Sequence, residues 1–187
     1  MRIRSSKVVV FLLTFFILLS QVFTSSFALA DNKVPFTIFH TNDMHGRLGY
    51  EEYKGKPSSF GSAREKALID KEKKENPDRT VIALDAGDAF QGLPASNQSK
   101  GQDMAKAMNE IGYKAMAAGN HEFDFGLDTV EKYKNNPQNG GWLNFPILST
   151  NVYKDGKRLF EPSTIINENG VKIGIVGVTT PETATKT

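Results

Sequence analysis

The sequence predicts an α/β fold built around a parallel sheet. Residues 36–41 and 80–84 are short runs of β-branched and apolar residues, as expected of strands buried on both faces of such a sheet. Residues 113–117 give a weaker form of the same signal. Segments with helical patterning separate these runs, and strands that alternate with helices are typical of a parallel sheet.

The first expected helix covers residues 63–74, with Ser62 as its candidate N-cap. Ala67 and Leu68 are expected on its inner face, together with Ile69 and Ala63. Its alternating charges are typical of a solvated helix face, which we favour over an anion-binding patch. This helix is therefore expected to cover the sheet.

Two further helices and three further strands are expected. The helices cover residues 102–111, where Gly112 ends the apolar pattern, and residues 127–133. The strands cover residues 145–149, 164–166 and 171–178. Residues 167–170, Asn-Glu-Asn-Gly, are typical of a hairpin turn between the last two strands.

Short polar clusters follow the first three strand-like runs. Asp43 and His45 come after the first run, Asp88 after the second and Asn120 after the third. Because the carboxyl ends of parallel strands meet at one edge of a sheet, we expect these side chains to lie together. Asp43 and His45 are two residues apart, so in extended backbone both would point the same way and could hold one cation. A glycine beside each cluster allows the close backbone approach that a crowded ionic site needs.

These residue types suit a centre with two divalent metal ions. Asp88 has two carboxylate oxygens and could bridge the first ion to a second, which the amide oxygen of Asn120 would bind. The sequence contains no cysteine. Oxygen and imidazole donors without thiolate favour Mn²⁺, Zn²⁺, Fe²⁺ or Mg²⁺ over a structural zinc site. The pattern therefore predicts most of a two-metal phosphoesterase centre.

Each cluster also has a simpler explanation. Asp43 and Asp88 could be turn residues, and Asn120 could be present because it tolerates a positive φ angle. His121 and Asp124, three residues apart, could form a surface ion pair. Four separate explanations would then have to hold at once, so the co-occurrence of the clusters favours the metal site.

Four segments together resemble the 5′-nucleotidase family of the calcineurin-like metallophosphatases. They are Thr41-Asn-Asp-Met-His-Gly46, Gly87-Asp-Ala-Phe-Gln-Gly92, Gly119-Asn-His-Glu-Phe-Asp124 and Gly177-Val-Thr-Thr-Pro-Glu182. The family includes UDP-sugar hydrolases and 2′,3′-cyclic-nucleotide phosphodiesterases. The resemblance covers residues 34–187 and implies part of a four-layer α/β/β/α metallophosphatase sandwich. It also implies hydrolysis of nucleotide phosphoesters, with a small-molecule nucleotide as substrate.

The resemblance implies a role for each matching residue. Asp43 and His45 would bind the first metal ion, Asp88 would bridge the two ions and Asn120 would bind the second. His121 would be a catalytic group rather than a ligand.

Asp124 would orient the His121 ring in that scheme, and Asn120 and His121 would contact the substrate phosphate. Glu122, between these residues, is interpreted as structural or as a residue that supports the metal ligands without binding the metal, since one more anion would add little to a site that is already filled.

The chain also departs from the family pattern. Family members supply further metal-binding histidines from two later segments and carry a separate C-terminal substrate-binding domain. Here the histidines are His40, His45 and His121, and His40 is expected to be a buried, hydrogen-bonded strand residue. Residues 31–187 are therefore expected to be the N-terminal part of a longer enzyme and to be inactive alone. A catalytically inert metal-binding fragment and a thiosulfohydrolase-like relative remain as alternatives.

Residues 1–30 have the pattern of a signal peptide. Arg2, Arg4 and Lys7 precede an apolar run at residues 8–19, and an Ala-Leu-Ala end follows at residues 28–30. The run is too short for a comfortable membrane span, so none is expected after cleavage. A secreted protein without cysteine suggests an extracellular or cell-wall-associated location in a Gram-positive bacterium.

The mature chain of about 157 residues is long enough for one compact domain. Removing the leader leaves 20 basic and 21 acidic residues. This near-neutral balance gives no reason to expect a nucleic-acid polymer as partner.

Overall fold

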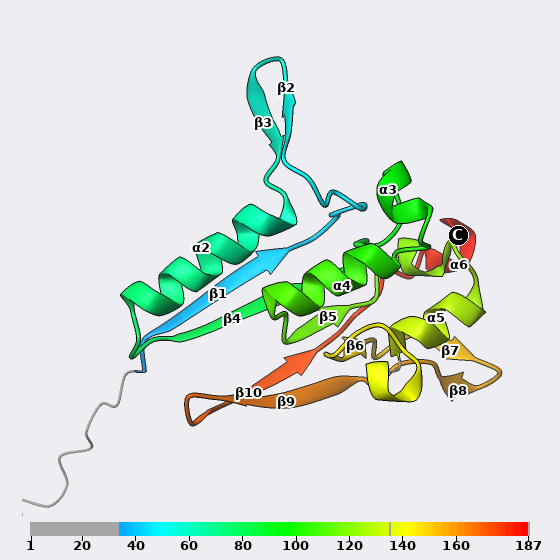
Figure 1. Ribbon diagram of the computed structural model, residues 1–187. Helices are drawn as coiled ribbons and strands as arrows, with labels where there is room; N and C mark the ends of the chain where they lie inside the picture. Colours follow the sequence, from blue (N-terminus) through cyan, green and yellow to red (C-terminus); the bar gives the residue numbers. More distant parts are fainter. Residues whose placement is uncertain (1–33, 135, 187) are drawn as a thin grey trace, which may run out of the picture. The chain divides into compact units, whose positions relative to one another are not determined.

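The computed structural model describes residues 34–134 and 136–186, and the expected signal peptide lies outside these residues. A parallel sheet with strand order β1-β4-β5-β6 lies at the centre of this part of the chain (Figure 1). Its strands are β1 Phe36–Thr41, β4 Thr80–Asp85, β5 Ala115–Ala117 and β6 Ile147–Leu148. The predicted α/β class with a parallel sheet is confirmed. The second sheet of a four-layer sandwich stays a prediction.

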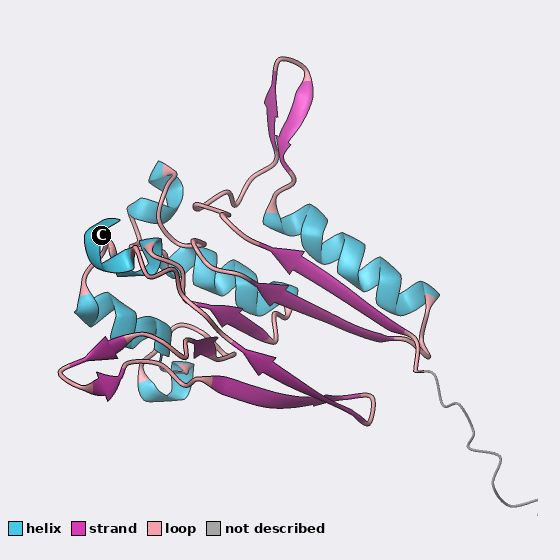
Figure 2. Ribbon diagram, turned by 180° about the vertical axis from the view of Figure 1, so that it is seen from behind, coloured by secondary structure: helices cyan, strands magenta, loops and turns pink. Residues whose placement is uncertain are grey.

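Two long helices pack side by side on one face of the sheet, as both ribbon views show (Figures 1 and 2). They are α2 Ser62–Glu75 and α4 Gln102–Ile111. The shorter helices are α3 Pro94–Asn97, η1 His121–Phe123, α5 Leu127–Lys134, η2 Pro137–Asn139 and α6 Thr183–Lys186. Within residues 34–134 and 136–186, no helix combines the length and the hydropathy that crossing a membrane requires.

Three antiparallel hairpins complete the described chain. They pair β2 Glu51–Tyr53 with β3 Lys56–Ser59, β7 Tyr153–Lys154 with β8 Lys157–Arg158, and β9 Ser163–Glu168 with β10 Val171–Val176. Both central residues of each turn have positive φ, as in Asn169-Gly170. This geometry matches the right-handed twist of the paired strands. The predicted β9–β10 hairpin is confirmed, whereas the other two were missed.

The core lies between the sheet and its helices. Strand β4 is buried at five of its six positions, as its continuous apolar run predicted. Helix α4 buries Met104, Met108 and Ile111 in the same core cluster, as expected. Farther along, Phe90 stacks on Tyr133 with ring centroids 4.1 Å apart. This packing fixes the loops that leave the carboxyl ends of the strands.

Two details of helix α2 differ from the prediction. Gly61 rather than Ser62 is the N-cap, because its φ of 78° is left-handed and a side chain there would strike the backbone of Tyr50. Leu68 is 45% exposed and Ala63 and Ala67 are also exposed, while Ile69 is buried as expected. The buried face of this helix includes Glu65, a charged residue that the apolar pattern did not predict to be buried.

One face of strand β1 is open in the described part of the chain. Phe36, Ile38 and His40 alternate along it and are exposed, Ile38 by 50%. The prediction that His40 is buried was wrong, because strand alternation places it on the same face as Ile38 and away from the helices.

Candidate metal centre

The loops that follow β1 and β4 run alongside each other. Three backbone N–H groups of the first loop donate to carbonyls of the second: Asp43 to Gly87 at 3.0 Å, His45 to Asp88 at 3.0 Å and Gly46 to Ala89 at 2.9 Å. This ladder extends past the strand ends and holds the two predicted clusters together.

The backbone within the ladder is unusual. Asp43, His45 and Asp88 have φ angles of 52°, 47° and 59°, a region that costs residues with a side chain about 1 kcal/mol or more. The expectation that Asp43 and His45 extend their side chains from a regular strand was therefore wrong. They still meet, because Asp43 Oδ1 lies 3.7 Å from His45 Nε2. Asn120, in contrast, has a φ of −77°, which removes the explanation based on a positive φ angle.

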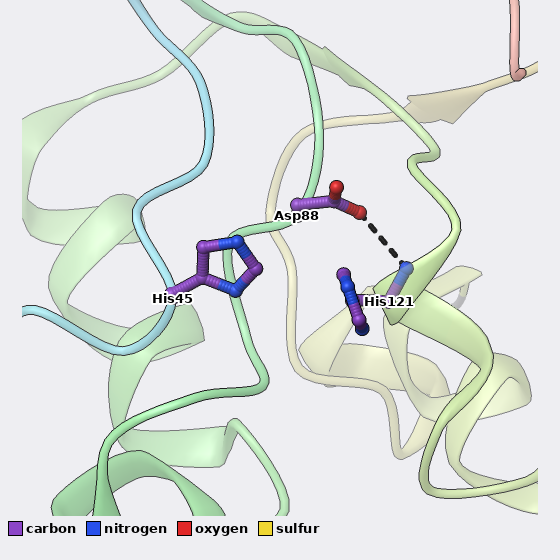
Figure 3. A group of neighbouring side chains, drawn as sticks. All are labelled: His45, Asp88 and His121. Atoms are coloured by element: carbon purple, nitrogen blue, oxygen red, sulfur yellow. Dashed lines mark hydrogen bonds between the residues drawn. The ribbon is translucent and has the colours of Figure 1, made fainter. Parts of the chain in front are cut away.

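His45, Asp88 and His121 form the centre of the site (Figure 3). One ligand atom from each lies within 4.8 Å of the others, a spacing that could hold a metal ion. The two imidazole rings are 5.1 Å apart between centroids and steeply tilted. Asp88 Oδ1 also accepts the backbone N–H of His121 at 2.8 Å. Three loops thus contribute to one cluster, as expected for loops that leave the carboxyl ends of parallel strands.

The donors in this cluster suit a divalent cation. His45 Nδ1 lies 2.9 Å from the carbonyl oxygen of Gln91. Donation from Nδ1 to that carbonyl leaves the Nε2 lone pair free, and histidines that bind metals are commonly held in this way. The Asp88 carboxylate supplies the anionic partner. Imidazole and carboxylate are donors that suit a divalent ion. Two of the four expected ligands, His45 and Asp88, belong to this group, whereas its third member, His121, is expected from the sequence to be a catalytic group rather than a ligand.

The remaining predicted residues lie around the cluster. Asp43 stands beside His45, outside the group of three, with a side chain that is 60% exposed. Asn120 occupies the N-cap position of η1, directly before His121. Asp124 Oδ2 lies 2.8 Å from His121 Nδ1, and this hydrogen bond is the main cause that raises the pKa of His121. The expected orientation of His121 by Asp124 matches this geometry.

Glu122 has a larger part in the site than the sequence indicated. Its side chain is fully buried and accepts backbone N–H groups from Asp88 at 2.8 Å, Ala89 at 2.9 Å and Gly119 at 2.6 Å. Burial raises its pKa to about 6, and these hydrogen bonds lower it. The sequence indicated a structural or ligand-supporting role, but its three partners become visible only in three dimensions.

A second buried carboxyl group supports the loop after β4. Asp85 accepts the Gly87 N–H at 2.8 Å and the Thr41 hydroxyl at 2.6 Å. Thr41 also contacts the Tyr113 hydroxyl at 2.7 Å, and Tyr113 donates to Glu65. Burial raises the pKa of Asp85 to about 7. This polar network connects α2 and three strand regions beneath the candidate centre.

The fourth motif segment supports the end of β5. Thr179 is buried and donates from its hydroxyl to the Ala118 carbonyl at 2.6 Å, directly before Gly119. Asn151 accepts the Thr179 N–H at 2.9 Å. The segment thus contributes to the backbone that leads into the site.

A cavity of about 510 Å³ adjoins the loop that carries Asp43 and His45. It is lined by Thr41, Asn42, Asp43, Met44, His45, Arg47, Ser58, Ser59, Phe60, Gly61 and Glu65. Its volume lies in the range of pockets that hold small organic ligands.

Comparison with known proteins agrees with this arrangement. The family model described as "Calcineurin-like phosphoesterase" matches residues 36–182. A 5′-nucleotidase of Vibrio parahaemolyticus is 41% identical over 159 residues, which cover 83% of this chain and 27% of that protein. The chain thus spans about a quarter of the length of this relative.

Solved structures show the same fold. The structure of a 5′-nucleotidase precursor from Thermus thermophilus has a TM-score of 0.67 and 35% identity, covering 79% of this chain and 29% of that one. A sulfate thiohydrolase, SoxB, from Thermus thermophilus has a TM-score of 0.68 at 18% identity, covering 83% and 37%, and shows likeness of fold alone. Since the family model matches most of the chain and its motif residues meet at one edge of the sheet, this chain belongs to the calcineurin-like phosphoesterase family.

Proposed function

We propose that this chain is the N-terminal part of a metal-dependent hydrolase of nucleotide phosphoesters. One observation carries the proposal: His45, Asp88 and His121 bring three ligand atoms within 4.8 Å of one another in a chain of this family. Similar proteins named 5′-nucleotidase support a nucleotide as the substrate. The specific ester could be a nucleoside 5′-phosphate, a UDP-sugar or a 2′,3′-cyclic nucleotide.

Four residues would hold two divalent ions. Asp43 and His45 would bind the first ion, Asp88 would bridge both and Asn120 would bind the second. When bound, such ions offset the charge of phosphate oxygens and lower the pKa of a coordinated water. The identity of the ions is open among Mn²⁺, Zn²⁺, Fe²⁺ and Mg²⁺.

His121 is the proposed acid or electrostatic group. Asp124 holds its Nδ1 at 2.8 Å, which leaves Nε2 to face the substrate. A proton on Nε2 would stabilise the negative charge that develops on the phosphoryl or leaving oxygen. The Asp124 carboxylate favours the protonated ring, and Asn120 would join His121 in contacting the phosphate.

The proposal includes export. The leader pattern at residues 1–30 directs the chain across a membrane, and the product would act outside the cell or at its wall.

The test is a chelation and replacement experiment on the full-length protein. Activity towards AMP, UDP-glucose and 2′,3′-cyclic AMP is measured before chelation, after chelation and after Mn²⁺ or Zn²⁺ is restored. We expect activity to disappear on chelation and return with metal. Full activity after exhaustive metal removal would overturn the proposal.

A matched pair of histidine variants locates the metal site. His45→Ala should lose bound metal, whereas His40→Ala should keep it, because His40 is an exposed strand residue outside the cluster. Equal metal content in the two variants would contradict the assignment of His45.

An inert fragment is the second candidate for residues 31–187 when they are expressed alone. The observation that favours it is the exposure of apolar strand residues, such as Ile38 at 50% and Ile165 at 75%. Titration of this fragment with Mn²⁺ and Zn²⁺, together with an activity assay, distinguishes an active fragment from an inert one. Tight binding of two ions with turnover like that of the full-length protein would exclude the inert fragment.

A further inference from the structure

Glu122 is a fully buried carboxylate that forms no ion pair within the described residues. Its exposed fraction is 0%, and no lysine or arginine of residues 34–134 and 136–186 pairs with it. A buried carboxylate without such a partner is costly unless hydrogen bonds satisfy its oxygens. Its hydrogen-bond partners should therefore explain its presence.

All three partners are backbone N–H groups at the floor of the candidate centre. One oxygen accepts from Asp88 at 2.8 Å and from Gly119 at 2.6 Å, and the other accepts from Ala89 at 2.9 Å. The N–H groups of Asp88 and Ala89 belong to the loop after β4, whereas that of Gly119 belongs to the loop after β5. The Glu122 carboxylate thus occupies an amide nest, which is the group of converging N–H donors of Asp88, Ala89 and Gly119.

A second bond runs in the opposite direction. The Asp88 carboxylate accepts the backbone N–H of His121 at 2.8 Å. The two loops therefore exchange contacts: a side chain of each binds backbone of the other. This reciprocal pairing fixes the separation of Asp88 and His121 from both sides.

We propose that Glu122 is a positioning residue that holds the Asp88 carboxylate and the His121 ring at the separation that the reaction requires. The proposal rests on the proposed function. Glu122 contacts no substrate in this scheme and acts through the backbone of Asp88, Ala89 and Gly119. Replacing a residue that orients metal ligands in this way typically lowers activity or metal affinity by about 10- to 100-fold.

The decisive variant is Glu122→Gln in the full-length protein. Glutamine has nearly the same volume, but its amide NH₂ group cannot accept a hydrogen bond and would face a backbone N–H. Val130→Ala is the matched control, because Val130 is also fully buried, lies in α5 and has an apolar side chain that takes no part in the hydrogen bonds of Glu122. Both variants should lower the melting temperature.

Kinetics measured well below both melting temperatures separate positioning from simple stability. We expect kcat of Glu122→Gln to fall by about 10- to 100-fold. We expect KM to stay within about threefold and Val130→Ala to keep the parental kcat. An unchanged kcat in Glu122→Gln, or an equal loss in Val130→Ala, would overturn the proposal.

A spectroscopic readout does not depend on activity. In ¹⁵N-labelled protein without metal, Glu122→Gln should shift the amide signals of Asp88, Ala89, Gly119 and His121, whereas Val130→Ala should leave them in place. If none of these four amide signals moves in Glu122→Gln, the positioning role is contradicted. If the parent protein proves inactive on phosphoesters while these signals move as expected, the proposed function fails and the structural linkage stands.

Discussion

Gly119 lies so close to Asp88 that a Cβ atom at position 119 would stand 2.2 Å from Asp88 Oδ1. That distance is shorter than any real contact of a Cβ atom, so the glycine leaves room for the carboxylate. The absence of a side chain at one position thus determines where the proposed bridging ligand can be.

Gly119→Ala should therefore displace the Asp88 carboxylate and break its bond to the His121 N–H. We expect turnover to fall by about 100-fold and stability by about 1–3 kcal/mol, as for other forced overpacking. Kinetics and urea unfolding measure the two effects. Gly174→Ala is the control, because a Cβ there meets nothing within 4 Å. Parental turnover in Gly119→Ala would show that the carboxylate can move without harm.

His121→Ala should reduce turnover by about two to four orders of magnitude while the protein keeps both metal ions, as expected for loss of an acid or electrostatic group. Metal analysis of the purified variant is the critical measurement, because His121 lies within ligand distance of His45 and Asp88. Loss of one ion would change its role to that of a ligand.

Asp124→Asn should lower the pKa of His121. The hydrogen bond from the Asp124 carboxylate raises that pKa by favouring the protonated ring, and a neutral amide removes most of this effect. The titration of the His121 ring protons by NMR in metal-free protein tests this. Asp128→Asn, in the first turn of α5, should leave the titration unchanged. A higher pKa in Asp124→Asn would refute the account.

Asp85 should make the metal-free protein less stable as pH rises. Burial raises its pKa from 3.8 to about 7 in the folded state, so the folded protein binds the proton more tightly than the unfolded chain does. Its stabilising contribution is complete below pH 3.8 and decreases up to about pH 7. Between pH 5 and 7 the decrease is about 2 kcal/mol.

Asp85→Asn should remove this part of the pH dependence in urea unfolding with a chelator present. Asp103→Asn changes an exposed carboxylate of α4 and should retain it. Parallel stability curves for Asp85→Asn and the parent would contradict the shifted pKa. Glu65, whose pKa is also raised by burial, should supply a remaining slope of the same sign.

Local patterns in the sequence predicted the elements with regular periodicity. The buried run of β4 and the apolar stripe of α4 are both set by residues within one element. The N-cap at Gly61 could not be found in this way, since the glycine is required by the backbone of Tyr50 on another segment. The exposure of His40 could not be predicted from a local pattern either, because it depends on which other segments cover β1.

The residues of the candidate centre were predicted better than its geometry. Asp43, His45 and Asp88 were found from their places after strands, yet their positive φ angles depend on hydrogen bonds between two distant loops. Glu122 was named but its three amide partners lie at positions 88, 89 and 119, and no local pattern connects them. The turns Lys54-Gly55 and Asp155-Gly156 did carry a local signal that the prediction missed.

The strands of the parallel sheet stand in the same order in space as along the chain, from β1 through β4 and β5 to β6. A polypeptide that leaves a ribosome or a membrane channel with its N-terminus first can therefore add each strand to the edge that the previous strand left open. All residues that this chain would contribute to the proposed centre, from Asp43 to Asp124, emerge before β6 does. A divalent ion could thus bind while the rest of the chain is still being delivered, and metal supply would then influence the yield of folded protein as well as its activity.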